Sequence, residues 1–223
     1  MSTGSYRIDY HSHILPEMDD GPKDRETAVE MLHLLREQGI LTVYATPHYY
    51  RHQETVEDFL ERRGRAAGML EKEAEVLGLK LLLGAEIHIE QQISELAKID
   101  ALVYENTRSV LLEFPWRGFE NWMLEEAEAI CWRYKLIPVF AHLERYLNLF
   151  SKEEIQRILD VPAGVIQINT ESLKKWKVRR WARRLLNEGY PIIFGSDCHN
   201  LGDRRPKKPP FYTKKLLKEA ETF

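Results

Sequence analysis

The chain has 223 residues, of which 43% are hydrophobic and 30% are charged, and its formal net charge is -3 at pH 7. This size and composition are typical of a globular protein, so we expect residues 1–223 to form a single domain without a general affinity for nucleic acid. No apolar run reaches the ~20 residues that span a bilayer, the first residues lack a signal segment, and two cysteines suit a reducing compartment, so we expect a cytoplasmic protein without membrane insertion.

The first half of the chain alternates apolar β-type runs with helical periodicities. Residues 6–10 predict a first strand. From Asp24, a residue type that caps helices, apolar residues repeat at helical spacing until Gly39. Residues 41–46 predict the second strand, a long apolar helical face covers 56–77, and residues 79–83 predict the third strand.

The second half repeats this alternation. A short helical piece at 91–98 precedes a strand at 109–112, and a helix at 123–134 precedes a strand at 136–141. A brief helix at 155–159, a strand at 164–168, a basic helix at 172–187 and a strand at 191–195 complete the pattern. About seven strands of continuous apolar character, separated by helices, predict a parallel α/β fold with both faces of its sheet covered.

Polar motifs follow almost every expected strand. In Asp9-Tyr10-His11-Ser12-His13, alternate residues of an extended segment point the same way, so both imidazoles can aim at one point. The other motifs are Thr46-Pro47-His48, Gly84-Ala85-Glu86, Leu112-Glu113-Phe114-Pro115, His142-Leu143-Glu144-Arg145 and Ser196-Asp197-Cys198-His199-Asn200. Functional residues of parallel α/β folds gather at the carboxyl ends of strands, and their spread over nearly every strand favours a closed barrel.

The residue types in these motifs suit metal-assisted phosphate chemistry. Mixed imidazole and carboxylate ligands favour Mn, Fe or Zn, whereas a dedicated Mg or Ca site uses oxygen alone. Metals ~3.5–4 Å apart lower the pKa of bound water and hold phosphoryl oxygens. Glu113 lies within an apolar run, where an unpaired carboxylate is costly, and arginines bind phosphate by bidentate hydrogen bonds.

Together these motifs resemble the polymerase-and-histidinol-phosphatase (PHP) superfamily, and within it the bacterial tyrosine-protein phosphatases of capsule and exopolysaccharide operons. The resemblance runs from Tyr6 to about Arg204 in the expected motif order. It implies a distorted seven-stranded, TIM-like βα barrel with three divalent metal ions, often manganese, with iron, zinc or magnesium as alternatives. It also implies that the substrate is a phosphotyrosine protein, in particular the tail of a bacterial tyrosine kinase of polysaccharide synthesis.

The resemblance further implies a role for each motif residue. The implied ligands are His11, His13, Glu86 and Asp197 for one metal, Glu86 as a bridge to a second metal completed by Glu113 and His142, and Asp20, His48 and His199 for the third. Arg145 and Arg204 match arginines that handle the phosphate. Asp19 is an alternative ligand to Asp20, but we expect it to be a solvated neighbour.

Other charged residues are expected outside the catalytic set. His33 and His52 are interpreted as structural or solvated, His88 as a rim residue, and Glu144 as a partner of an arginine. The basic run Lys174, Lys175, Lys177, Arg179, Arg180, Arg183 and Arg184 is either a solvated helix face or a surface that attracts an acidic peptide.

Three alternative functions remain open from the sequence. Cys198 and Arg204 fit the C-x5-R phosphate loop of cysteine-dependent phosphatases, although Asp197 would raise the pKa of the thiol and the Pro-rich residues that follow oppose a helix. The second is a histidinol-phosphatase-like phosphomonoesterase of small molecules on the same metals, which the absence of a third histidine in the first motif makes less fitting. The third is a non-catalytic, metal-binding regulatory module.

Overall fold

A computed structural model describes residues 6–220, and its strands form a ring. The strands are β1 (Ile8–Ser12), β2 (Thr42–Ala45), β3 (His48–Tyr49), β4 (Lys80–Leu83), β5 (Glu86–His88), β6 (Ser109–Glu113), β7 (Ile137–Phe140), β8 (Val165–Asn169) and β9 (Ile192–Gly195). They pair in parallel in the orders β1-β2-β4 and β3-β5-β6-β7-β8-β9. This arrangement confirms the predicted parallel α/β fold.

Two of the strands are interrupted, which explains why two sheets form one barrel. β2 and β3 are one chain segment broken at Thr46 and Pro47, and β4 and β5 are one segment broken at Gly84 and Ala85. Hydrogen bonds continue across the breaks, from the Gly84 N–H to the Ala45 carbonyl at 2.9 Å and from the Glu86 N–H to the Pro47 carbonyl at 3.0 Å. Counted by chain segment, seven strands surround the barrel, as predicted.

The ring closes where β9 meets β1. The backbone N–H of Asp197 donates to the His11 carbonyl at 2.7 Å, and that of His13 donates to the Cys198 carbonyl at 2.9 Å. A Cβ at Gly195 would lie 2.4 Å from the Cβ of His11, so only glycine permits this approach. The closure brings the first and last polar motifs of the chain together.

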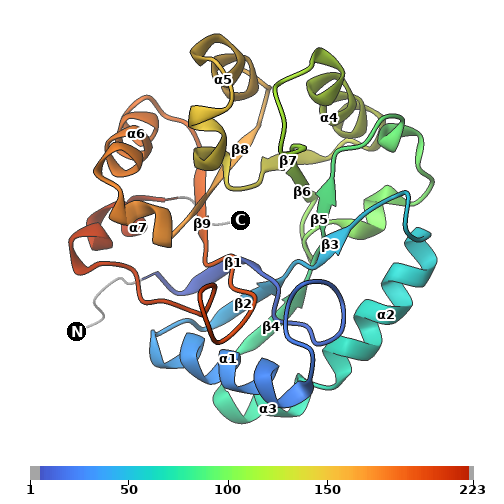
Figure 1. Cartoon of the computed structure of the whole chain (residues 1–223), viewed down its shortest axis with the longest axis vertical. Coiled ribbons are helices and arrows are strands. Elements are labelled where there is room, and N and C mark those ends of the chain that lie inside the picture. Colours follow the sequence, from blue (N-terminus) through green and yellow to red (C-terminus); the bar gives the residue numbers. More distant parts are fainter. Residues whose placement is uncertain (1–5, 221–223) are drawn as a thin grey trace.

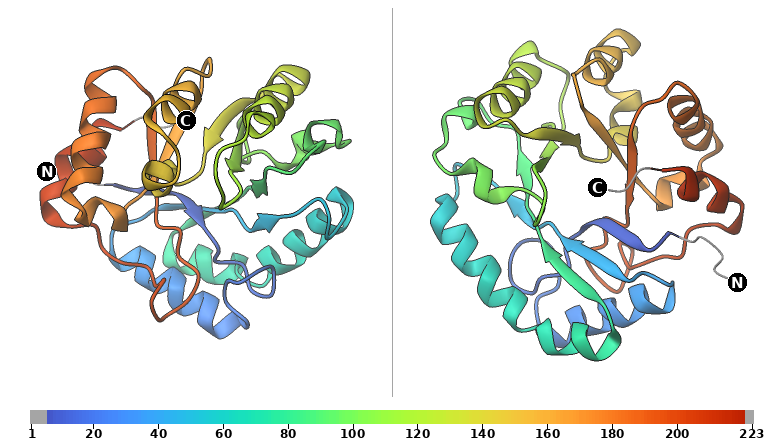
Figure 2. Two further views of the ribbon diagram at one scale, coloured as in Figure 1. Left: turned by 45° about the horizontal axis from the view of Figure 1, so that its top comes forward. Right: turned by 180° about the vertical axis from the view of Figure 1, so that it is seen from behind.

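The helices lie outside the strands (Figures 1 and 2). They are α1 (Arg25–Glu37), α2 (Val56–Gly68), α3 (Glu71–Leu77), α4 (Asn121–Tyr134), α5 (Lys152–Leu159), α6 (Trp176–Asn187) and α7 (Lys214–Glu219). Short 3-10 segments are η1 (Ile93–Glu95), η2 (Ile99–Leu102), η3 (Leu143–Asn148), η4 (Glu171–Lys174) and η5 (Phe211–Thr213). Among the described residues, no helix is both long and apolar enough to cross a bilayer.

Two hydrophobic clusters hold the barrel. The larger packs the outer faces of the strands against the helices, with Met31, Leu32 and Leu35 of α1 almost fully buried. The smaller takes one side chain from each of the seven strand segments, as the inside of a barrel requires: Tyr10, Tyr44, Leu82, Leu111, Val139, Val165 and Ile193. Aromatic and branched side chains therefore fill the barrel below the polar motifs.

Local expectations differ from the structure at four places. The basic helix expected from residue 172 begins only at Trp176, because residues 171–174 form the 3-10 segment η4. The single helix expected over 56–77 is two helices, because α2 ends at Gly68 and the freed carbonyl of Met69 accepts a hydrogen bond from Arg25 at 2.9 Å. The helical piece expected at 91–98 contains only the 3-10 turn η1. The helix α7 follows a Pro-rich stretch and was not predicted. By contrast, Asp24 caps α1 as expected, accepting from the Thr27 N–H.

Candidate metal centre

All nine side chains predicted to bind metal lie together at the carboxyl ends of the strands. Eight of them fall into three overlapping groups whose donor atoms lie within 4.8 Å of one another: His13, Asp20, His48 and His199; His11, His13 and Asp197; and His48, Glu86 and Glu113. The ninth, His142, joins them through its Nε2, which lies 2.9 Å from Glu86 Oε1 and 3.4 Å from Glu113 Oε1. Residues spread over most of the chain thus converge on one site.

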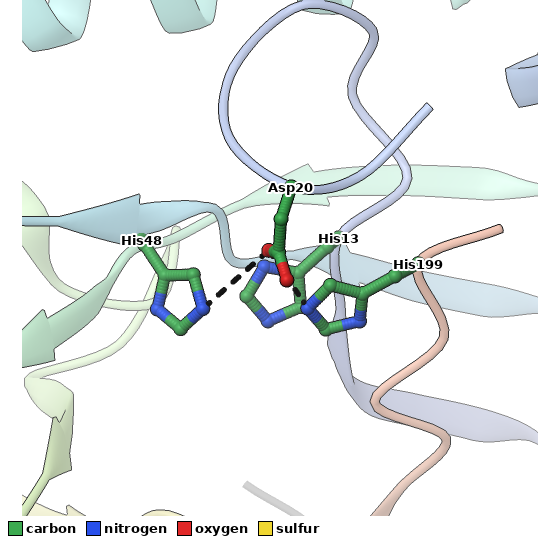
Figure 3. Close-up of side chains that lie close together, drawn as sticks. All are labelled: His13, Asp20, His48 and His199. Carbon is green, nitrogen blue, oxygen red and sulfur yellow. Dashed lines mark ion pairs between the residues drawn. The ribbon is translucent and has the colours of Figure 1, made fainter. Parts of the chain in front are cut away.

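Figure 3 shows the outermost group. Asp20 comes from the loop after β1, and its carboxylate points toward three imidazoles. Its Oδ1 lies 3.2 Å from His199 Nε2 and 3.7 Å from His48 Nε2. The Asp20 side chain is 59% exposed, whereas that of His199 is fully buried. This group therefore forms the solvent-facing edge of the cluster.

Glu86 lies at the middle of the cluster. Its side chain is fully buried, and its Oε2 lies 3.1 Å from the Nε2 atoms of both His11 and His13 and 3.2 Å from His48 Nδ1. Although burial raises the pKa of this carboxyl group, nearby His11 and His48 outweigh it and hold the pKa well below the usual range. Despite these close nitrogens, neither carboxylate oxygen accepts a hydrogen bond of ordinary geometry from residues 6–220. A buried carboxylate without hydrogen bonds is energetically costly, and a bound cation would stabilise it.

The outer nitrogen of several rings is held by an acceptor. His11 Nδ1 lies 3.0 Å from Gln167 Oε1, His13 Nδ1 lies 2.7 Å from Asp19 Oδ2, and His199 Nδ1 lies 3.0 Å from the Asp197 carbonyl. Each acceptor fixes the proton on Nδ1, which leaves the Nε2 lone pair facing the cluster.

This tautomer assignment tests whether metal fits the site. The Nε2 atoms of His11 and His13 are 3.1 Å apart. With both protons on Nδ1, two lone pairs face each other and cannot form a hydrogen bond, whereas a shared cation satisfies both. The residues present therefore fit divalent metal ions bound by imidazole and carboxylate.

Asp19 is not the solvated neighbour that we expected. Its side chain is only 6% exposed, and besides His13 it accepts hydrogen bonds from the backbone N–H groups of His48 and Gly21, each at 2.9 Å. The expectation was wrong because sequence adjacency to Asp20 says nothing about which carboxylate turns inward. Asp19 orients His13, while Asp20 faces the imidazoles.

Gln167 and Asn169 support the site and were missed from the sequence. Besides holding His11, Gln167 Oε1 accepts from the His142 N–H at 2.6 Å. Its amide donates to Asn169 Oδ1 at 3.0 Å, and the Asn169 amide donates to Asp197 Oδ2 at 2.8 Å. A signal was present, because both are polar residues at alternate positions of the otherwise apolar strand β8.

Arg145 and Arg204 both contact Asp197. Arg145 Nη2 donates to Asp197 Oδ2, and Arg204 donates to Asp197 Oδ1 and Asp20 Oδ2, each at 3.0 Å. The two arginines line one small cavity of about 110 Å³. Within the described residues Arg145 forms no ion pair with Glu144, which is buried and accepts instead from the Asn169 N–H at 3.3 Å. The expected Glu144–arginine pair is therefore wrong, and both guanidinium groups lie over the carboxylates of the site.

The alternative centred on Cys198 is contradicted. The thiol is 1% exposed and packs in the larger hydrophobic cluster. Burial and the nearby Asp9 carboxylate raise the pKa of the Cys198 thiol, which opposes formation of a nucleophilic thiolate. Residues 199–210 contain no helix, so the loop lacks the helix start that a phosphate loop needs.

The remaining histidines lie where the sequence suggested. His33 is 49% exposed and lies 3.1 Å from Glu73, and His52 is 62% exposed and lies 2.8 Å from Glu90. His88, 23% exposed, contacts Glu113 from the rim at 3.2 Å. None of these three belongs to the clusters of possible metal ligands found among the described residues.

Comparisons with known proteins match most of the chain. The family model described as capsular polysaccharide synthesis, CpsB/CapC, matches residues 7–218. The chain is 32% identical over 219 residues to the tyrosine-protein phosphatase YwqE of Bacillus subtilis, covering 94% of this chain and 82% of that protein. It is 30% identical over 213 residues to the tyrosine-protein phosphatase CpsB of Streptococcus agalactiae, covering 89% and 85%.

A solved structure is also similar to this chain over nearly its full length. It comes from work on YwqE of Bacillus subtilis and CpsB of Streptococcus pneumoniae, described as metal-dependent tyrosine phosphatases. The TM-score is 0.70 at 25% sequence identity, with 97% of this chain and 96% of the other covered. The whole barrel, and not a fragment of it, is therefore similar to that structure.

Proposed function

Because this chain belongs to the CpsB/CapC family of capsular polysaccharide synthesis, we propose that it is a metal-dependent phosphatase that hydrolyses phosphotyrosine in proteins. The observation that carries the proposal is the buried Glu86 carboxylate, which four imidazoles approach at 2.9–3.2 Å without an ordinary hydrogen bond within residues 6–220. Such a group stabilises cations, and the two arginines beside it suit an anionic substrate.

The proposed ligand set keeps the assignment made from the sequence. It comprises His11, His13, Asp20, His48, Glu86, Glu113, His142, Asp197 and His199 around three ions, with manganese as the first choice and iron, zinc or magnesium as alternatives. When bound, divalent ions would lower the pKa of a water molecule and neutralise phosphoryl oxygens. The short distances from Glu86 to rings on several strands support its position as a bridge between ions.

The chain's own residues would position the substrate. Arg145 and Arg204 approach Asp197 from one cavity, so their guanidinium groups are placed to bind phosphate by bidentate hydrogen bonds. Tyrosine, whose phenol has a pKa near ~10, needs less protonation on leaving than an alkyl alcohol does. Phosphotyrosine therefore suits a site that is rich in metal ligands and arginine.

We further propose the setting in which the enzyme works. Membership of a capsule-synthesis family supports a substrate on the tail of a bacterial tyrosine kinase of that process. Two free cysteines support a reducing cytoplasm. A single domain over residues 1–223 is supported by one continuous hydrophobic cluster that includes residues of both halves of the chain.

The test is hydrolysis of tyrosine-phosphorylated peptides beside histidinol phosphate, with each metal added back after chelation. We expect peptide turnover that is lost with EDTA and restored by Mn²⁺. Preferential turnover of histidinol phosphate would favour the small-molecule phosphomonoesterase. Metal binding without turnover of either substrate would favour the regulatory module.

A further inference from the structure

Beside the metal centre lies a groove of about 1020 Å³. The segments that follow β6, β7 and β8 line it, together with the start of α6. Its main side chains are Trp116, Arg145, Lys174, Lys175, Trp176 and Lys177. Arg145 also lines the small cavity next to Asp197. The groove and the arginine cavity thus share a wall, so a ligand in one lies next to a ligand in the other.

Two tryptophans give the groove an apolar surface that faces solvent. Trp116 is 68% exposed and Trp176 is 57% exposed. The Trp116 ring lies against Tyr146 with centroids 5.4 Å apart, and Tyr146 stacks on His142 with centroids 6.1 Å apart. A run of aromatic rings therefore connects the groove to the metal centre. Large exposed side chains in a hollow next to a reaction site are typical of a surface that binds a partner.

The charge on the groove is positive. Lys174 pairs with Glu171 at 3.1 Å. Lys175 and Lys177 are exposed and form no ion pair or side-chain hydrogen bond with any residue in the range 6–220. Glu144, the acidic residue of the lining, is buried and accepts a hydrogen bond from the Asn169 backbone. Two unpaired ammonium groups beside an arginine attract an anionic ligand.

We propose that this groove binds the peptide segment that flanks the phosphotyrosine, and that it prefers segments combining acidic residues with an aromatic or apolar side chain. This inference rests on the proposed phosphatase function, since it names the substrate class of the same site. Lys175 and Lys177 attract the carboxylates, and the indoles of Trp116 and Trp176 offer flat surfaces for the apolar side chain. An extended peptide advances ~3.3 Å per residue, so neighbours of the phosphotyrosine reach the groove while Arg145 faces the phosphate.

Peptide kinetics on the full chain test this inference. The substrates are three phosphotyrosine peptides of equal length with acidic, neutral or basic flanking residues, together with p-nitrophenyl phosphate, which has no flanks. The variants are the double variant Lys175→Ala, Lys177→Ala and the single variant Trp176→Ala. The matched control is Lys72→Ala, Lys80→Ala, which removes two exposed lysines remote from the groove lining.

We expect the wild-type protein to prefer the acidic peptide. In the double lysine variant, KM for that peptide should rise by about fivefold to twentyfold while kcat is unchanged, because the attraction is lost equally from the bound peptide and from the transition state. When each of the three peptides also carries one aromatic flanking residue, Trp176→Ala should raise KM for all three. Turnover of p-nitrophenyl phosphate should be unaffected in every variant, and the control should match the wild type.

Several outcomes would overturn the inference. Equal kcat/KM for acidic and neutral peptides in the wild type would do so, as would an unchanged KM in the double lysine variant. Co-sedimentation with phosphatidylglycerol vesicles tests a membrane surface as occupant. If the two lysines control vesicle binding but not peptide KM, the groove belongs to a membrane and the proposal fails. If p-nitrophenyl phosphate is hydrolysed but no phosphotyrosine peptide is, the proposed function fails and this inference fails with it.

Discussion

Two sites share the mouth of this barrel, and they are built in opposite ways. In the metal centre, His11, His13 and Glu86 are buried, and the outer nitrogen of each of these two rings has its own hydrogen-bond partner. In the groove, Trp116 and Trp176 are largely exposed, and two of the three lysines have no partner within the described residues. One site is fixed by internal contacts, and the other is open to outside ligands.

This difference indicates which residues can be substituted without affecting their neighbours. A buried charged group is stable only while its partners satisfy it, so each residue of the metal centre depends on several others. An exposed lysine depends on few neighbours, and replacing it leaves stability nearly unchanged. We therefore expect catalysis to be sensitive to changes throughout the metal centre, whereas changes at the exposed lysines and tryptophans of the groove alter substrate preference alone.

The largest effect should follow from removing Glu86. Glu86→Ala takes away the carboxylate that four rings approach, so more than one ion should be lost and turnover should fall by about a thousandfold or more. Elemental analysis of the purified variant, together with phosphotyrosine peptide turnover, measures both effects. His33→Ala, at an exposed histidine outside the centre, should keep the metal content and activity of the wild type. An unchanged metal content in Glu86→Ala would contradict the bridging role.

Replacement of the arginines should be the next largest effect. Arg145→Ala and Arg204→Ala should each lower kcat by roughly 30- to 1,000-fold, because a charge-assisted contact to the phosphoryl group is lost in the transition state. Metal content should stay at the wild-type level. Lysine should restore only part of the rate, since it keeps the charge without the bidentate geometry. Near-normal kcat in both alanine variants would reduce these residues to ion-pair partners of Asp197.

The partners behind the ligands should have an intermediate effect. Gln167→Leu and Asp19→Leu remove the acceptors of the outer nitrogens of His11 and His13, so metal affinity should fall by about 10- to 100-fold. Titration of the chelated protein with Mn²⁺ measures this change. Gln91→Leu, at an exposed glutamine, serves as the matched control. Wild-type affinity for Mn²⁺ in both variants would show that packing alone holds the two imidazole rings. The metal centre would then not be fixed by internal hydrogen bonds in the way that distinguishes it from the groove.

The smallest effect should follow from changing Cys198. Cys198→Ala removes a buried sulfur atom, so the free energy of unfolding should fall by about 1 kcal/mol while kcat stays within about twofold of the wild type. Denaturant unfolding and peptide kinetics provide the two measurements. Thiol alkylation of the native protein should likewise leave activity intact. If Cys198→Ala folds and binds metal but has no phosphatase activity, the cysteine takes part in catalysis and this prediction is wrong.

Much of the architecture was readable from the sequence because it rests on local patterns. Apolar runs of strand length alternate with helical periodicity, and the polar motifs come directly after the runs. Since parallel strands place their carboxyl ends at one edge, the convergence of the polar motifs followed from the pattern, whereas the choice of the nine ligands within them followed from the resemblance to the PHP superfamily. The structure brings these side chains together, while their metal binding stays a prediction.

Tertiary structure decided what depends on residues far apart in the chain. Gln167 holds His11 across 156 positions, and Asp19 rather than Asp20 accepts from the outer nitrogen of His13, through a loop whose path no local pattern specifies. The groove likewise combines Trp116 with lysines of a segment that begins more than fifty positions later. Local residue patterns specify the elements and the order of the motifs. Side-chain partners are chosen when the barrel closes, because only then do distant surfaces compete for the same hydrogen bonds and contacts.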